Sequence, residues 1–410
     1  MGSREKSDKV EQPLSGQLFL GRGSIPAARN HAVTLTALFI TGAAAFANLY
    51  ATQPLLPRFR ESFRASELLV SLTVSAAVLA VALTAPLIGS FGDRMGRKGV
   101  IVGALLGLGL TTALSATATS LGQLVIWRFI EGCFVPGIIA VTMAYIAEES
   151  PPGSIGATMA IYVTGTVVGG FGGRFIAGLA AARWDWHAAF ALLGGVTLAG
   201  ALVTWRLLPR STKFVRQRNV AAAFRSMRMH LRNPELLATY AVGFEVLFCI
   251  VGAFTYVSFY LADEPFFLGP AALASIFAVY LIGAAITPFA GYVMDRIGLR
   301  RALMAAVGMS ALGMSLTLIH SVPVIIAGLA LEASGVFACQ AAASSHVGKA
   351  ALEARSSASG LYVSFYYLGG FAGSIIPGIL WKQTGWPGCV TIILCIQCLT
   401  ILIAKKFWRD

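Results

Sequence analysis

Five ionisable residues lie within long apolar stretches of this 410-residue sequence: Arg128, Glu131, Arg174, Glu245 and Glu332. A charged side chain at the centre of a bilayer costs roughly 2.5 to 3.5 kcal/mol on insertion scales, so such residues face protein or water and mark functional sites. Arg128 and Glu131 are three positions apart, which puts them on one helical face within reach of an ion pair. Glu332 follows Glu131 by 201 positions. Glu245 lies roughly 15 Å deep by helix rise, near the midplane.

The chemistry that suits these residues is proton transfer. A desolvated carboxylate without a cation beside it favours its neutral form, and it can therefore load and release a proton. We expect Arg128 to keep Glu131 ionised, which leaves Glu245 and Glu332 as the better proton carriers. Two alternatives stay open. Each carboxylate could serve only in a structural ion pair, and Arg128 could hold an anionic substrate.

The sequence does not indicate an enzyme, a cofactor or a metal site. No nucleophile, base and orienting group stand out together, and Gly107 and Gly109 lie within an apolar span rather than in a phosphate-binding loop. Cys395 and Cys398 have the spacing of a redox or metal motif, but no cluster of His or Cys residues accompanies them. Packing of small side chains is the simpler interpretation of these cysteines.

Membrane helices must position the five ionisable residues. The sequence is 57% hydrophobic and only 12% charged. About twelve apolar runs approach the length of about 20 residues that crosses a bilayer as a helix. The composition thus predicts an all-α membrane protein. The runs start near Ala32, Leu68, Gly99, Leu121, Ile155, Ala188, Leu236, Pro270, Ala302, Pro323, Ala358 and Pro387.

The sequence also repeats itself at about half its length. The segment 89–98 recurs as 291–300, and the glycine-rich stretch that begins at Tyr162 recurs from Tyr362. A duplicated bundle with parallel halves is one architecture of secondary transporters, with a binding site between the halves. We expect a cytoplasmic segment at 1–31, bundles at 32–208 and 235–405, and a cytoplasmic tail at 406–410. The basic linker at 209–234 is expected to form an amphipathic helix on anionic lipid.

Basic residues set the orientation of the chain. Lys and Arg accumulate in cytoplasmic loops, and most of the 31 basic residues fall in segments that are cytoplasmic if the amino terminus lies inside. Both termini are therefore predicted in the cytoplasm and the chain in the inner, or plasma, membrane. The same bias explains the net charge of +13, so no nucleic-acid partner is expected. The amino-terminal residues do not resemble a signal peptide, so we expect the first span to be retained.

The repeated segment resembles the signature of the major facilitator superfamily, Gly-x-x-x-Asp-Arg-x-Gly-Arg-Lys between spans 2 and 3. The matching residues are Gly89, Asp93, Arg94, Gly96 and Arg97. The resemblance implies the fold of that superfamily, with twelve transmembrane helices in two pseudo-symmetric six-helix halves. It also implies that this loop gates the inner face.

The same resemblance implies partners for the gating loop. Asp93 would face the start of span 11, near Ser356 and Ser357, and Arg97 would pair with a carboxylate at the inner end of span 4. Glu148 and Glu149 stand at that end. The corresponding gating residues of the second half are Asp295 and Arg296.

Span 5 resembles the antiporter motif of the superfamily. Gly156, Gly165, Gly169 and Gly173 occupy four of its glycine positions, whereas the proline and last glycine of the motif are replaced here by residues 170 and 174. Close helix packing through small residues is the alternative explanation of this stripe. Residues 48–54 also resemble bacterial exporters of the arabinose-efflux-permease and drug-antiporter type.

Spans 1, 4, 7 and 10 line the central cavity in the superfamily, and span 4 has the family's Arg-x-x-x-Gly motif. The residues expected at the cavity are Asn48, Gln53, Arg128, Glu131, Glu245, Tyr256 and Glu332. We expect a monomeric, proton-coupled exporter, or antiporter, of a small amphipathic, drug-like or sugar-like solute. The alternatives are proton-coupled uptake of a small organic anion on Arg128, a non-transporting membrane sensor, and an intramembrane enzyme.

Overall fold

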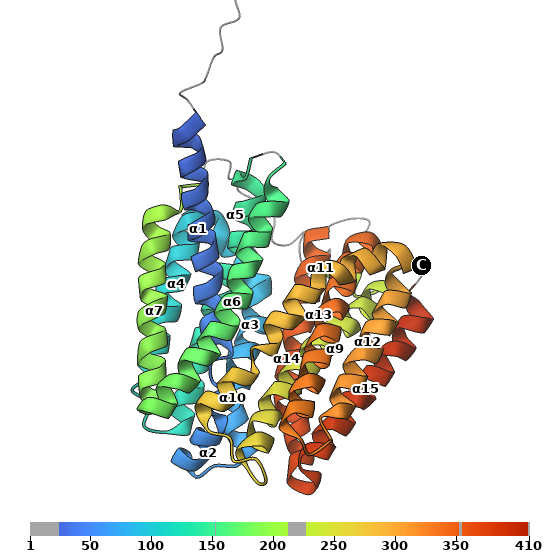
Figure 1. The fold of residues 1–410 in the computed structure, drawn as a ribbon. Coiled ribbons are helices and arrows are strands. Elements are labelled where there is room, and N and C mark those ends of the chain that lie inside the picture. Colours follow the sequence, from blue (N-terminus) through green and yellow to red (C-terminus); the bar gives the residue numbers. More distant parts are fainter. Residues whose placement is uncertain (1–23, 152, 212–226, 352–354, 409–410) are drawn as a thin grey trace, which may run out of the picture.

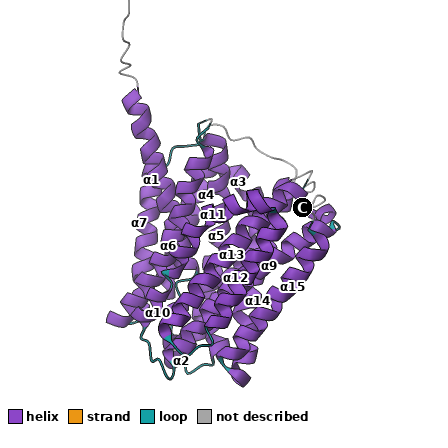
Figure 2. Cartoon of the chain, turned by 45° about the vertical axis from the view of Figure 1, so that its right-hand side comes forward, coloured by secondary structure: helices purple, strands orange, loops and turns teal. Residues whose placement is uncertain are grey.

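A computed structural model describes residues 24–151, 153–211, 227–351 and 355–408. All regular secondary structure in these ranges is helical, as Figure 2 shows. The expected all-α fold is confirmed for this part of the chain. Most of the predicted linker helix lies outside the described residues.

The amino-terminal half contains six long helices and two short ones. After α1, a single 3₁₀ turn and the short helix α2 cover one end of the bundle. The elements are α1 (Ser24–Leu49), η1 (Gln53–Leu55), α2 (Leu56–Phe63), α3 (Glu67–Met95), α4 (Arg97–Ser115), α5 (Leu121–Glu149), α6 (Ile155–Arg183) and α7 (Trp186–Leu207).

The carboxy-terminal half repeats this plan. Its second span is divided in two at residues 277–278, which the sequence did not predict. The elements are α9 (Pro234–Ala262), α10 (Pro270–Ile276), α11 (Val279–Ile297), α12 (Leu299–Leu316), α13 (Val322–Ala350), α14 (Arg355–Thr384) and α15 (Trp386–Phe407).

Polar side chains fix where several helices begin. Ser66, Ser120 and Asp185 accept hydrogen bonds from backbone N–H groups in the first turns of α3, α5 and α7. Asn233 does the same for α9, where Pro234 occupies the first helical position. Such caps satisfy donors that a helix start leaves without a partner. The observed starts lie within a few residues of the predicted apolar runs, except that α1 begins eight residues before Ala32.

Eleven helical segments in the described ranges are long and apolar enough to cross a membrane. The remaining expected span is α12, which has only 18 residues and begins with Arg300 and Arg301 in its first turn. It lies in the bundle with its neighbours (Figure 1). We call the end where α1 begins and α15 ends the inner end, since the basic loops lie there, and the opposite end the outer end.

The two halves use glycine in equivalent ways. A Cβ at Gly169 of α6 would lie 2.1 Å from the backbone oxygen of Ala43 in α1, and one at Gly369 of α14 would lie 1.9 Å from that of Phe244 in α9. Only glycine allows these helices to approach so closely. The contacts confirm that α1 and α6 correspond to α9 and α14.

The halves meet mainly through α3 and α14 and near the outer end. Figure 1 shows the amino-terminal half in blue to green and the carboxy-terminal half in yellow to red, with ribbons that separate toward the inner end. Hydrogen bonds across the outer interface join Gln53 to Thr255 and Ser75 to Ser374. The arrangement is therefore closed at the outer end.

Candidate functional site

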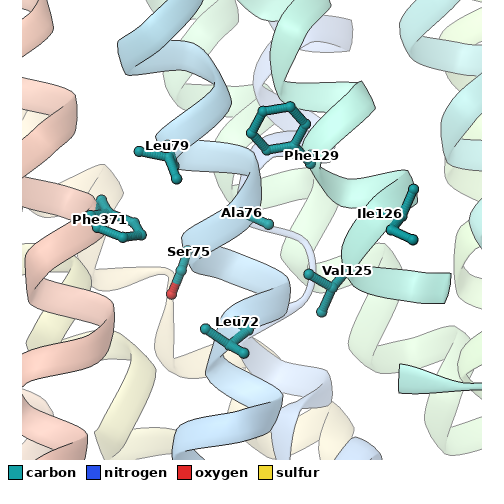
Figure 3. Close-up of a pocket in the computed structure, with 8 residues that line it drawn as sticks. All are labelled: Leu72, Ser75, Ala76, Leu79, Val125, Ile126, Phe129 and Phe371. Atoms are coloured by element: carbon teal, nitrogen blue, oxygen red, sulfur yellow. The ribbon is translucent and has the colours of Figure 1, made fainter. Parts of the chain in front are cut away.

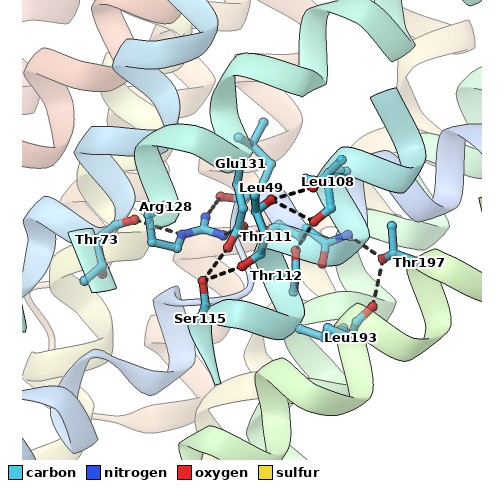
Figure 4. A network of polar contacts seen from close by, with 12 residues as sticks. Leu49, Thr73, Leu108, Thr111, Thr112, Ser115, Arg128, Glu131, Leu193 and Thr197 are labelled. Atoms are coloured by element: carbon cyan, nitrogen blue, oxygen red, sulfur yellow. Dashed lines mark hydrogen bonds and ion pairs between the residues drawn. The ribbon is translucent and has the colours of Figure 1, made fainter. Parts of the chain in front are cut away.

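Arg128 and Glu131 form a buried ion pair on α5, as their spacing predicted. The Arg128 guanidinium also donates to three backbone oxygens, those of Asn48 (3.1 Å), Leu49 (2.6 Å) and Thr73 (3.1 Å). Arg128 is 0% exposed and Glu131 1%. Figure 4 shows how α1, α3, α4 and α5 supply the partners.

The second carboxylate oxygen of Glu131 is occupied as well. The Ser115 hydroxyl of α4 donates to it over 2.7 Å. Each charge of the pair thus has several partners within the amino-terminal half, which is the condition under which a buried ion pair is tolerated. The structure thus places the whole network of the pair inside this half.

Asn48 belongs to the same polar network. Its side-chain amide donates to the Thr197 hydroxyl of α7 (2.7 Å) and to the backbone oxygen of Ala44 (2.8 Å). These bonds connect α1 to α7 next to the backbone oxygens that accept hydrogen bonds from Arg128. Asn48 therefore holds the end of α1 against α7.

Glu245 and Glu332 differ from Glu131 in their partners. Both are buried, at 1% and 0% exposure, on α9 and α13 of the carboxy-terminal half. The Cys249 thiol donates weakly to one oxygen of Glu245 over 3.3 Å. Among the described residues, the other oxygen of Glu245 and both oxygens of Glu332 have no hydrogen-bond partner. No ion pair to a cation is found for either carboxylate within the described ranges.

The two carboxylates of this half lie on neighbouring helices. The helices that carry them, α9 and α13, pack together. Two carboxylates are thus buried on packed helices of one half, and the described residues offer neither of them a cation.

Gln53 and Tyr256, both expected at the cavity, lie in the closed outer interface. The Gln53 amide donates to the Thr255 hydroxyl of α9 over 3.3 Å. The Tyr256 hydroxyl donates to the backbone oxygen of Ser374 (2.8 Å) and to the Ser71 hydroxyl of α3 (3.4 Å). In this conformation both residues help to hold the two halves together.

Arg60 and Asp263 form an ion pair between the halves that the sequence analysis missed. The Arg60 guanidinium contacts both carboxylate oxygens of Asp263, at 2.8 and 2.5 Å. It also donates to Glu67 at 3.0 Å. The two residues follow corresponding spans of the repeat. A pseudo-two-fold axis brings equivalent positions of the two halves together. The separation of Arg60 and Asp263 along the chain, close to that of the repeat, was therefore the signal that could have predicted this ion pair.

The inner gating loop is described only in part. Arg97 donates to both carboxylate oxygens of Glu148, at 3.1 and 2.7 Å, so the expected pairing with the end of span 4 is found. The surroundings of Gly89 and the side chains of Asp93, Arg94 and Ser356 lie outside what the structure describes.

Backbone geometry explains why both loops contain a glycine at the equivalent position. Gly96 and Gly298 connect the paired helices of the loops with φ angles of 74° and 86°, a region that side chains other than glycine rarely adopt. Asp295 and Arg296 are exposed. The gating roles of these residues stay predictions.

The antiporter-motif glycines of α6 divide into two groups. Gly165, Gly169 and Gly173 pack against α1, where an added Cβ would lie 2.3, 2.1 and 1.9 Å from backbone oxygens. A Cβ at Gly156 would meet nothing within 4 Å. Three of the four positions are thus explained by helix packing, which supports the alternative explanation of the stripe.

Two open pockets border these helices. One of about 370 Å³ lies at the seam of the halves, where apolar side chains of α3 and α5 face Phe371 of α14 beside Ser75 (Figure 3). Another, of about 220 Å³, lies between α9, α14 and α15 and is lined by Glu245, Phe244 and Phe365. Of the expected cavity residues, Glu245 is the one that borders either pocket.

Comparison with known proteins identifies the family. The model of the Major Facilitator Superfamily matches residues 38–276 and 264–410. The chain belongs to the major facilitator superfamily. It is therefore a secondary transporter of a small molecule rather than an enzyme.

Two bacterial relatives match nearly full length. The chain is 33% identical over 410 residues to the inner membrane transport protein YnfM of Escherichia coli (strain K12), covering 98% of this chain and 96% of that protein. It is 32% identical over 373 residues to the uncharacterized MFS-type transporter YybF of Bacillus subtilis (strain 168), covering 91% of each. The superfamily member described here is accordingly a multi-pass inner-membrane protein.

A solved structure supports the fold. The inward-facing, unoccupied form of a bacterial homolog of the human lysosomal transporter Spinster aligns with a TM-score of 0.76. The alignment covers 95% of this chain and 100% of that chain at 16% identity. At this level of identity the likeness shows the major facilitator fold alone.

Proposed function

We propose that this superfamily member is a proton-coupled exporter, an antiporter, of a small amphipathic solute that is drug-like or sugar-like. The observation that carries the proposal is the pair Glu245 and Glu332, two buried carboxylates without a cation partner in the described part of the chain. Desolvation makes the neutral form of such groups favourable, so each can bind and release a proton. Alternating access would expose them to the two sides of the membrane in turn.

Antiport follows if solute and proton compete for the same carboxylates. From the inner side, a cationic or hydrogen-bonding solute would bind best to an ionised carboxylate and would displace its proton. From the outer side, a returning proton would neutralise the carboxylate and release the solute. Phe244 and Phe365 next to Glu245 supply apolar and aromatic surface for an amphipathic molecule.

The contacts of Arg128 argue against the main alternative. Proton-coupled uptake of an organic anion would need this arginine to offer donors to the solute. Its guanidinium instead donates to Glu131 and to three backbone oxygens, and it is 0% exposed. An anion would have to displace several of these buried bonds, each of which is costly to leave unmade.

The experiment that tests the proposal measures proton movement in inverted membrane vesicles with an acidic lumen. Tetraphenylphosphonium, chloramphenicol, arabinose and benzoate represent cationic, neutral, sugar and anionic solutes. Export predicts that the lumen becomes more alkaline when a transported cation or neutral solute is added, since protons leave as solute enters. Vesicles without the protein give the baseline. A response to benzoate alone would support anion transport instead and would contradict the proposal.

A further inference from the structure

Arg174 on α6 is a buried cation in an unusual setting. Its side chain is 4% exposed, and its guanidinium lies over three aromatic rings, those of Tyr50 (5.0 Å), Phe277 (4.9 Å) and Tyr280 (4.8 Å). It also donates to the Gln53 side-chain oxygen (2.9 Å) and to the backbone oxygen of Gly170 (2.6 Å). We call the three rings the aromatic cage.

No carboxylate forms an ion pair with Arg174 within the described ranges. The charge is held instead by the faces of the rings and by two neutral oxygens. Cation–π contacts gain strength when water is excluded, and arginine is the cation most often found in them. Because a buried charge without compensation is costly, Arg174 depends on the cage to remain in this position.

The cage is assembled from both halves of the transporter. Tyr50 and Gln53 follow α1, and Phe277 and Tyr280 lie at the break between α10 and α11. Backbone bonds from Phe277 to Ala274 and from Tyr280 to Phe277 form tight turns at this break. The break therefore aims two rings of the carboxy-terminal half at an arginine of the other half.

Gln53 connects this cluster to a further interface contact. Its oxygen accepts from Arg174 while its nitrogen donates to Thr255 of α9. A single side chain thus couples Arg174 to α9 of the opposite half, in addition to the two rings of that half that Arg174 contacts directly. These contacts exist only while the outer end is closed, since separating the halves removes two of the three rings and the Thr255 bond.

We propose that Arg174 and the aromatic cage form the latch that holds the outer end closed. The latch rests on alternating access but not on the nature of the solute or of the coupling ion. When the outer end opens, water can replace the rings around the guanidinium, so the latch is reversible.

The test measures outward opening directly. A cysteine introduced by Ser71→Cys lies in the closed outer interface, since Ser71 is 0% exposed. In right-side-out vesicles, a membrane-impermeant maleimide reaches it only when the outer end opens, and the chain without this substitution gives the background of the six native cysteines. We expect Arg174→Gln to raise the labelling rate about tenfold, the change for about 1.4 kcal/mol.

Matched variants separate the latch from general damage. Tyr280→Leu removes a ring and should raise labelling, whereas Tyr280→Phe keeps the ring and should not. Arg183→Gln makes the same change at an exposed position of the same helix and should leave the rate unchanged. If Arg174→Gln fails to fold, the comparison of Tyr280→Leu with Tyr280→Phe still tests the latch.

The latch is overturned if both Arg174→Gln and Tyr280→Leu label at the parental rate while Arg60→Glu, which opposes Asp263, labels faster. It is also overturned if Tyr280→Phe opens the outer end as much as Tyr280→Leu. No solute or gradient is used, so failure of the exporter proposal in the proton-flux assay would leave these results standing.

Discussion

The two halves of this transporter share their helices but not their charges. Glu131 on α5 and Glu332 on α13 occupy equivalent positions, 201 residues apart, and both helices follow a serine. Three residues earlier, α5 has Arg128 whereas α13 has Leu329, which is fully buried. The same fold therefore holds an ionised pair in one half and an unpaired carboxylate in the other.

The two halves therefore differ in how their buried charges are compensated. Arg128 and its partners connect α1, α3, α4 and α5, so the amino-terminal half contains a fixed charged network. Among the described residues, Glu332 and Glu245 of the carboxy-terminal half have no cation partner, and this is the feature on which the exporter proposal depends. The symmetric scaffold therefore carries a leucine in one half where it carries an arginine in the other, and the exporter proposal rests on that difference.

The largest effect is expected when the unpaired carboxylates are neutralised. Glu245→Gln, Glu332→Gln and the double variant remove the groups that we propose to carry the proton. We expect gradient-driven solute accumulation to be abolished in at least one single variant and in the double, while solute exchange without a gradient continues. Transport assays in vesicles measure both. Glu264→Gln, at an exposed position of the same half, is the control.

The next largest effect should come from giving the amino-terminal half the residues of the other half. Arg128→Leu leaves Glu131 buried without its cation, and breaking a buried ion pair on one side typically costs about 3 to 5 kcal/mol. Adding Glu131→Gln should restore much of the stability but not transport. Thermal unfolding of the single and double variants measures this. A stable Arg128→Leu that has lost only the binding of anions would favour the uptake alternative.

A smaller loss of thermal stability, equal in the two halves, is expected from alanine at the equivalent packing glycines. Gly169→Ala and Gly369→Ala each push a Cβ against a backbone oxygen of the neighbouring helix. Overpacking of this kind costs about 1 to 3 kcal/mol, and we expect similar losses of thermal stability in the two variants. Gly156→Ala, where the added Cβ meets nothing, should cost nothing. Markedly unequal losses would show that the halves also differ in packing.

The smallest effect concerns the inner end. Arg97 and Glu148 are partly exposed, at 12% and 27%, and such pairs contribute roughly 0.2 to 1 kcal/mol. A double-mutant cycle with Arg97→Gln and Glu148→Gln should give a coupling energy in this range. A coupling of zero would leave the pair without a role in holding the inner end of this half together.

Periodicity and composition were sufficient for much of the fold. Helix starts followed from apolar runs, and the spacing of Arg128 and Glu131 gave their ion pair. The backbone oxygens that accept hydrogen bonds from Arg128 could not be predicted, because their positions depend on how α1 and α3 pack against α5. The break at Phe277 was also missed, since neither proline nor glycine marks it in the sequence.

Contacts between the halves were the least accessible to sequence analysis. Arg174 appeared as a departure from a glycine motif, and only the packing of α6 against α10 and α11 shows which rings surround it. Gln53 and Tyr256 were expected at the cavity because their helices line it. In this conformation both residues hydrogen-bond across the seam of the halves, and their place at the cavity stays a prediction.

The central claim is that the proton is carried by the unpaired carboxylates of the carboxy-terminal half. Infrared difference spectroscopy of the purified protein detects the carbonyl band of a protonated carboxylic acid directly, without a known solute. We predict a buried-acid band that titrates with pH, that is lost in Glu245→Gln with Glu332→Gln, and that persists in Glu131→Gln. Loss of the band in Glu131→Gln, with an unchanged band in the double variant, would contradict the account.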